Sequence, residues 1–345
     1  GTNLKYYINE GGAYHDITPI RLISGAGDAT FATGADTIDG AIDAVAISIL
    51  LDSVTGFPVS GRIKIDNEEM TYAAISSNNL TGVTRGVNGT AAAAHADGAA
   101  ITCATITVTE VDHEALVNDF VTFTDAATLG GTITAAVLNQ EYEITAIVSD
   151  DIFQIDARTV STIGSITTTD GLNPTFVYSN ASDSGSGGGA TVATYQINTG
   201  LDTTIAGNGW GAGTWGRGTW NSNADLSATG QTLRIWSHDN FGEDLIINVR
   251  DAGLFYWDKS NGVSTRAVAL NSLSGANAVP TIAKQVLVSD IDRHVIAFGC
   301  DSETNPGTQD PLLIRFSDQE NVAEWQSLAT NTAGDLRIGS GSKII

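Results

Sequence analysis

The sequence predicts a mainly β protein, and three observations lead to this prediction. Short runs rich in Thr, Val and Ile alternate apolar and polar residues, which is the period of a half-buried strand. Gly, Asn, Asp and Ser separate these runs at the spacing of a strand plus a turn. The chain has 38 glycines and 6 prolines, so its sharp turns depend mostly on glycine, which tolerates positive φ. A sandwich, a barrel or a propeller would each show this pattern.

The first 103 residues divide into three parts. Residues 1–22 predict two short strands, LKYYIN and AYHDITPI, around a Glu-Gly-Gly turn. Residues 23–40 are small and polar, which is typical of a linker. Residues 41–103 predict a compact β module, in which SGRIKIDNEEMTYAAIS is a hairpin with Asp66-Asn67 at its turn.

The middle of the chain predicts a second β module and a connecting segment. Residues 104–180 contain the strand-like runs VTFTD, YEITAIV and IFQIDA. Residues 181–230 begin with a flexible joint, SDSGSGGGAT, and continue with the Gly- and Trp-rich run GNGWGAGTWGRGTW. We expect this segment to connect the modules to the C-terminal part.

Residues 231–345 contain a faint internal repeat. The first copy consists of an apolar strand, a polar turn, DLIINV, a tight turn and LFYW. The second copy has VLVS, HVIAFG and LLIRFS in a similar order. Aromatic-rich strands repeated at about 40–60 residues are typical of propeller blades. Residues 1–22 share the strand–turn–strand character, so we expect them to pack beside 231–345. The fold expected is therefore an incomplete propeller-like platform that carries two inserted β modules.

The charge and size of the chain exclude several classes of function. The chain has 345 residues, enough for two or three domains, and its net charge is −23. A protein this acidic should not bind nucleic acid by neutralising phosphates, and an anionic membrane surface should repel it. It has no apolar run of the length that a bilayer span needs, and no signal peptide pattern is visible. We therefore expect no membrane insertion.

Several segments carry a resemblance to a known family. They are GTNLKYYINEGGAYHDITPIR, IWSHDNFGEDLIINVRDAGLFYWD, DRHVIAFGCD and DPLLIRFSDQENVAEWQ, followed by TNTAGDLRIGSGSKI. In these segments the chain resembles the tail nozzle proteins of short-tailed bacteriophages, also called tail tubular protein B or stabilisation proteins. The 41–103 and 104–180 units resemble small modules found in phage structural proteins. Both chain ends look like cuts through a larger folded unit.

The resemblance implies a structural role in the virion and no enzymatic activity. It implies a ring of identical copies, a hexamer, that contacts portal-adaptor proteins and tail fibres and lines the DNA ejection channel. Genomic DNA would pass through without tight binding, because an acidic lumen repels phosphates. The protein would assemble in the cytoplasm of the host bacterium and reside in the viral tail. No cofactor is implied.

The residues that could carry chemistry favour structural interpretations. The five histidines do not stand at metal-ligand spacing, and Asp112-His113-Glu114 is interpreted as part of a structural module although it could suggest acid–base catalysis. Two groups of acids could ligate Ca²⁺ but are interpreted as solvated turn acids: Asp150, Asp151 and Asp156, and Asp290 with Asp292. Neither a catalytic site nor a metal site is therefore expected. Glu68 and Glu69 are expected to face solvent or, alternatively, a partner subunit.

Three tryptophans and two cysteines complete the candidate residues. Trp210, Trp215 and Trp220 recur every five residues and are expected to pack against a neighbouring domain or subunit. They could also stack on single-stranded nucleic acid, which the charge of the chain opposes. Cys103 and Cys300 predict two buried free thiols. The alternative functions are a receptor- or glycan-binding tail module and, as a further possibility, a tail-associated enzyme that cleaves glycans with a pair of acids.

Overall fold

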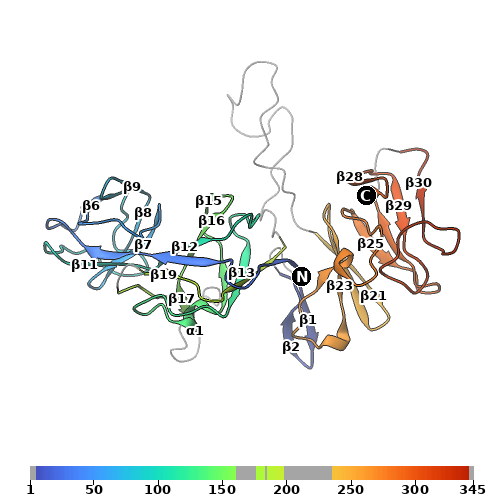
Figure 1. Ribbon diagram of the computed structural model, residues 1–345, viewed down its shortest axis with the longest axis horizontal. Helices are drawn as coiled ribbons and strands as arrows, with labels where there is room; N and C mark the ends of the chain where they lie inside the picture. Colours follow the sequence, from blue (N-terminus) through green and yellow to red (C-terminus); the bar gives the residue numbers. More distant parts are fainter. Residues whose placement is uncertain (1–4, 161–175, 183–184, 198–234, 342–345) are drawn as a thin grey trace, which may run out of the picture. The chain divides into compact units, whose positions relative to one another are not determined.

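The computed structural model describes residues 5–160, 176–182, 185–197 and 235–341. Almost all of the regular structure in this part is strand (Figure 1), so the mainly β fold class is confirmed. The described helices are short: α1 (Ala135–Leu138) and the 3-10 helices η1 (Lys259–Asn261) and η2 (Leu270–Ser272). None of them is long enough or apolar enough to cross a bilayer.

The chain divides into two compact units. Unit 1 comprises residues 1–21 and 199–345, and unit 2 comprises residues 22–198. Unit 2 is thus inserted in the sequence of unit 1. It contains two cores, which belong to two modules.

The first module of unit 2 has two small antiparallel sheets, ordered β5-β11-β7-β8 and β6-β10-β9. Its core includes Ile63, Met70 and Tyr72, which alternate with outward residues along the predicted hairpin. Asp66 at the hairpin turn has φ 51°, the left-handed conformation that Asp tolerates in tight turns. The strands are β5 (Ala35–Thr37), β6 (Ser48–Leu50), β7 (Gly61–Ile65), β8 (Glu68–Tyr72), β9 (Ala74–Ser76), β10 (Asn79–Thr81) and β11 (Ala100–Cys103).

The second module contains a five-stranded sheet, ordered β15-β16-β12-β4-β19, and a group ordered β14-β13-β20. Phe31 and Phe123 meet edge to face in its core, with ring centroids 5.0 Å apart. The strands are β4 (Thr30–Thr33), β12 (Thr105–Thr109), β13 (Phe120–Thr124), β14 (Glu141–Glu143), β15 (Ala146–Ser149), β16 (Ile152–Asp156), β17 (Arg158–Val160), β18 (Phe176–Tyr178), β19 (Gly185–Gly187) and β20 (Val192–Gln196).

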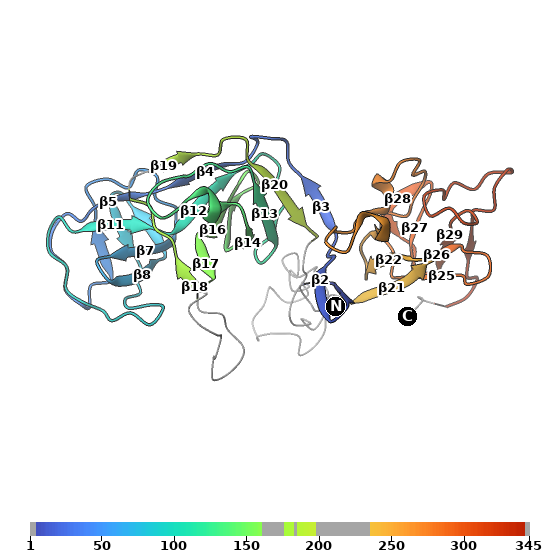
Figure 2. The same ribbon diagram turned by 90° about the horizontal axis from the view of Figure 1, so that it is seen from below.

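The expectation of a linker at residues 23–40 is wrong, because this segment contributes β4 and β5 to the two modules. Figure 2 shows β4 running between β12 and β19, with which it pairs. Phe31 and Thr33 are buried, so the segment follows a strand period although its composition is small and polar. Strands β19 and β20 likewise lie in the segment expected to be a connection, and they complete the second module.

The two modules of unit 2 are joined through Arg62 on β7. Its backbone N–H donates to Thr105 Oγ1 over 2.8 Å. Its guanidinium lies 3.8 Å from the ring centroid of Tyr178, and within 3.7 Å of carboxylate oxygens of Glu69 and Asp156. Cation–π and ionic contacts at one side chain therefore hold residues of both modules together.

Most strands of unit 1 form two antiparallel groups that share one core, and β27 and β28 form a separate pair. One group is ordered β24-β23-β22-β21 and the other β25-β26-β29-β30. Strand β3 (Ile20–Ile23) starts in unit 1, where Ile20 pairs in parallel with Val268. The strands are β21 (Trp236–Phe241), β22 (Asp244–Val249), β23 (Leu254–Trp257), β24 (Val268–Ala269), β25 (Gln285–Val288), β26 (Val295–Phe298), β27 (Asp301–Ser302), β28 (Asn305–Gln309), β29 (Leu313–Phe316) and β30 (Gly334–Arg337).

The two groups of unit 1 meet at β21 and β25. Ser237 Oγ accepts a hydrogen bond from Val286 N over 3.1 Å, and Asp239 Oδ2 accepts one from Val288 N over 2.8 Å. The shared core includes Trp325, which is 1% exposed. The predicted repeat thus corresponds to two groups of antiparallel strands, whereas a propeller remains a prediction.

The N-terminal segment packs within unit 1, as its strand–turn–aromatic pattern predicts. Strands β1 (Tyr7–Glu10) and β2 (Ala13–Asp16) form a hairpin. The Tyr6 ring centroid lies 5.0 Å from that of Trp236. Asp16 accepts from Lys5 Nζ over 2.9 Å and lies 3.4 Å from Arg266, so a charged cluster also ties the segment to the C-terminal part.

The prediction of two buried free thiols is confirmed. Cys103 and Cys300 are both unpaired as thiols and fully buried, one in each unit. Burial raises the pKa of each thiol to about 12. At neutral pH they are therefore small apolar core residues with little nucleophilic character.

Candidate functional site

The structure places Asp112-His113-Glu114 in the loop that joins β12 to β13. His113 is 1% exposed, and its ring meets Phe153 edge to face at 4.9 Å. Nδ1 accepts a hydrogen bond from the backbone N–H of Ala115 over 2.9 Å. A nitrogen that accepts carries no proton, so the ring is the Nε2–H tautomer. His113 thus fixes the course of its loop.

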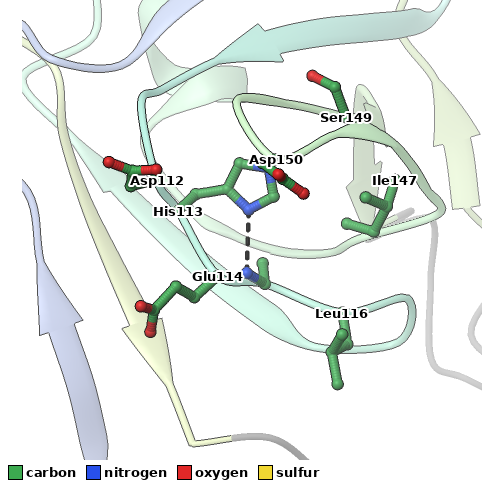
Figure 3. A pocket seen from close by; sticks show the side chains of 8 residues that line it. Asp112, His113, Glu114, Leu116, Ile147, Ser149 and Asp150 are labelled. Carbon is green, nitrogen blue, oxygen red and sulfur yellow. Dashed lines mark hydrogen bonds between the residues drawn. The ribbon is translucent and has the colours of Figure 1, made fainter. Parts of the chain in front are cut away.

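A hollow of about 380 Å³ lies beside His113, between this loop and the β15–β16 hairpin. In the close-up of Figure 3, Leu116 and Ile147 lie on one side of the imidazole, and Asp112 and Glu114 on the other. Asp150 is a further lining residue, from the turn between β15 and β16. The hollow therefore combines an aliphatic side with carboxylates, and its lining residues include neither Lys nor Arg.

Aliphatic side chains around the hollow are unusually exposed for their type. The exposed fractions are 73% for Val111, 41% for Leu116, 48% for Val117 and 38% for Val148. Leu116 lines the hollow, Val111 and Val117 lie on the same loop, and Val148 lies on β15. Exposed aliphatic residues near one another are of the kind that bind partners, whereas single ones are common. Three of these positions lie in the loop between β12 and β13, where residue periodicity gives no signal of exposure.

The loop that carries the hollow is held in a defined conformation. Asp112, Glu114 and Asn118 have φ of 54°, 51° and 72°, which non-glycine residues adopt at a cost. The Asp151 carboxylate accepts from the backbone N–H of Asp112 over 3.0 Å. The Asp119 carboxylate accepts a second backbone N–H of the loop over 2.9 Å. The surface is therefore preorganised, which reduces the entropy lost when a partner binds.

The acids considered as Ca²⁺ ligands have separate roles. Asp150 lines the hollow, Asp151 holds the loop, and Asp156 accepts a hydrogen bond from Thr105 Oγ1. Asp290 and Asp292 are exposed. Within the described ranges, no group of three or more His, Cys, Asp or Glu side chains could hold a metal ion.

A buried charge network in the first module is the strongest electrostatic feature of unit 2. Arg85 donates from Nε and Nη2 to the two oxygens of Glu68, over 2.8 and 2.7 Å. His95 lies 2.9 Å from Glu68 through Nε2 and 2.8 Å from Asp66 through Nδ1. Arg85 also donates to the carbonyl of Asp43, so the network fastens the loops on either side of the hairpin.

The expectation that Glu68 faces solvent is wrong, because it is 1% exposed. Strand β8 buries every second residue, and Glu68 has the same parity as Met70 and Tyr72. Burial raises the pKa of this carboxyl, but hydrogen bonds from Arg85, from backbone N–H groups and from His95 outweigh burial and lower the pKa to about 2. Glu69, on the opposite face, is only partly buried.

A second hollow, of about 230 Å³, lies in unit 1. Its lining includes the buried Arg315 and Trp325 and the exposed Glu303 and Asp335. Arg315 is 3% exposed and donates to the carbonyls of Ala278 and Trp325. These bonds join neighbouring loops, so the arginine acts as a structural clamp.

The predicted packing tryptophans, Trp210, Trp215 and Trp220, lie outside the described residues. The expectation for them stays a prediction. The candidate site that the structure adds is the hollow beside His113, which sequence reasoning located only through Asp112-His113-Glu114.

Comparisons with known proteins give little further information. Neither a protein-family model nor a curated protein matches the chain. Among solved structures, the chain is similar to the phage phi92 endosialidase, with 9% sequence identity and a TM-score of 0.17. The alignment covers 95% of this chain and 40% of that protein, so the chain spans less than half the length of the matched structure. A TM-score this low does not indicate a shared fold.

Proposed function

We propose that this chain is a structural protein of a short phage tail, a subunit of the nozzle ring through which DNA leaves. The proposal starts from the sequence resemblance to tail nozzle proteins in residues 1–21 and in the C-terminal part. The observation that carries it furthest is the organisation of the chain. Residues 1–21 and 199–345 belong to one unit although 177 residues separate them in sequence. This organisation is the one expected if β modules are inserted into a platform.

The charge of the chain is distributed in a way that refines this proposal. Unit 2 contains four Lys and Arg residues against 21 Asp and Glu residues, a net charge of −17 out of −23 for the whole chain. Unit 1 accounts for the remaining −6. Repulsion of DNA by an acidic lumen therefore requires unit 2 near the lumen, whereas a ring wall made by unit 1 would repel DNA more weakly.

The ion pairs of the chain support a structural role more than an enzymatic one. A general acid at neutral pH needs a carboxyl whose pKa is raised. At Asp16 and Glu68 the balance is the opposite: burial raises the pKa, but hydrogen bonds and neighbouring basic groups lower it further. Such carboxylates stay ionised and stabilise the fold.

A glycan-binding module would present aromatic side chains in a shallow groove. Within the described ranges, the exposed large aromatic residues are Tyr7 and Tyr14 on the β1–β2 hairpin. Neither of them lines either of the two hollows described above. We therefore rank the structural role first.

The test is the oligomeric state of the purified chain. Mass photometry and negative-stain electron microscopy over a range of protein concentrations should show closed rings of identical copies. A chain that stays monomeric at the highest soluble concentration would contradict the proposal.

A further inference from the structure

The hollow beside His113 belongs to the most acidic part of the chain. Of the four basic residues of unit 2, Arg85 is buried in the ion pair with Glu68, and Arg62 contacts Glu69 and Asp156. Two of the four bases are thus already matched by carboxylates. The field outside unit 2 is negative and attracts cationic partners from a distance.

The local chemistry of the hollow specifies more than charge. Leu116 and Ile147 provide an aliphatic side, and the lining residues Asp112, Glu114 and Asp150 provide carboxylates (Figure 3). This combination matches a lysine or arginine side chain, which has an aliphatic stem and a charged end. Aliphatic neighbours of such a residue could cover the exposed Val117.

We propose that the hollow between residues 110–119 and 147–151 binds a basic segment of a partner protein. A lysine or arginine of that segment lies at Asp112 and Asp150, and its aliphatic neighbours pack on Leu116 and Ile147. The inference depends on the geometry and charge of unit 2, and it holds whether or not the chain forms a nozzle ring.

Other classes of ligand fit the same hollow less well. Nucleic acid and anionic lipid would be repelled by a unit with a net charge of −17. Glycan sites depend on aromatic side chains, whereas the lining residues with rings are limited to His113, which is buried. A basic peptide satisfies both the carboxylates and the aliphatic side chains.

The test uses the full chain, labelled with ¹⁵N, and a probe peptide Ac-Gly-Leu-Lys-Leu-Gly-NH₂. The matched control peptide replaces its lysine with glutamate. Amide shifts should change at residues 110–119 and 147–151 with the lysine peptide, and much less with the glutamate peptide. High salt should weaken binding, because the Debye length falls from about 10 Å at 0.1 M to about 3 Å at 1 M.

Two variants separate the charged and apolar contributions. Asp112→Asn with Asp150→Asn should weaken binding by up to about fivefold for each carboxylate removed. Leu116→Ser should weaken binding without changing its salt dependence. The control is Asp290→Asn with Asp292→Asn, which removes the same charge from exposed positions in unit 1.

The outcomes are decisive in both directions. Localised shifts that are lost in the first two variants and retained in the control support the site. Absence of shifts at both loops would overturn the site, because binding would then be absent. Equal shifts with both peptides, or equal weakening by the control variant, would also overturn it. Binding would then not depend on the chemistry of this hollow.

Discussion

Removal of Arg85 should destabilise the first module of unit 2 by about 3 kcal/mol. Breaking a buried ion pair by deleting one partner costs about 3–5 kcal/mol, because the remaining charge stays buried without compensation. In Arg85→Ala, Glu68 loses two hydrogen bonds of 2.8 and 2.7 Å. It keeps the backbone N–H groups of Gly86 and Ala93 and the contact with His95, which places the cost at the lower end of the range.

The six tryptophans make this prediction measurable, since all of them belong to unit 1. Hydrogen exchange of peptides from residues 61–103 reports on the first module, and tryptophan emission reports on unit 1. A loss of about 3 kcal/mol corresponds to roughly 100-fold faster exchange through local opening. The tryptophan emission transition in urea should not move. The tryptophans are Trp210, Trp215, Trp220, Trp236, Trp257 and Trp325.

The matched control removes a surface pair. Arg337 donates to Asp310 over 2.7 Å, but the Arg337 side chain is 61% exposed. Arg337→Ala should therefore cost no more than about 1 kcal/mol. If exchange in residues 61–103 is unchanged in Arg85→Ala, or if both variants cost the same, the argument from burial is refuted.

Three further predictions follow from the same structure. The folded-state pKa of Glu68 is about 2, below its usual 4.5. The stability that this carboxylate contributes is therefore present above pH 4.5 and is lost as the pH falls towards 2. Glu68→Gln should flatten the pH dependence of stability, measured by hydrogen exchange. Trp215→Ala should cost about 3–5 kcal/mol and impair ring assembly if the side chain is packed, whereas unchanged sedimentation would refute packing. Replacing residues 22–198 by a Gly/Ser bridge should leave the tryptophan emission transition of unit 1 intact. Removing only residues 36–180 should expose β4 and β20, because these strands lose their partners β12 and β13. Equal solubility of the two truncated chains would contradict the unit boundaries.

The sequence predicted the local structure of the chain better than its boundaries. The hairpin at Asp66-Asn67 was predictable, because turn residues and alternation occur within one short window. The strand at Thr30–Thr33 was not, since its partners on β12 and β19 lie about 75 and 155 residues away along the chain. Strand pairing over such distances depends on tertiary packing that residue composition does not reveal.

The candidate site was only partly visible in the sequence. The parity of Glu68 with Met70 and Tyr72 along the strand could have indicated an inward carboxylate. The pairing of Arg85 with Glu68 and His95 required the fold. The hollow beside His113 could not be predicted, because turn geometry determines which aliphatic side chains remain exposed.

The most direct test of the central proposal is a cryo-electron microscopy reconstruction of the native particle that contains this chain, purified with an antibody against unit 2. The proposal predicts a closed ring of identical copies at the end of a short tail, around a channel wide enough for duplex DNA. Isolated copies at fibre tips or on the capsid surface, away from any channel, would contradict it.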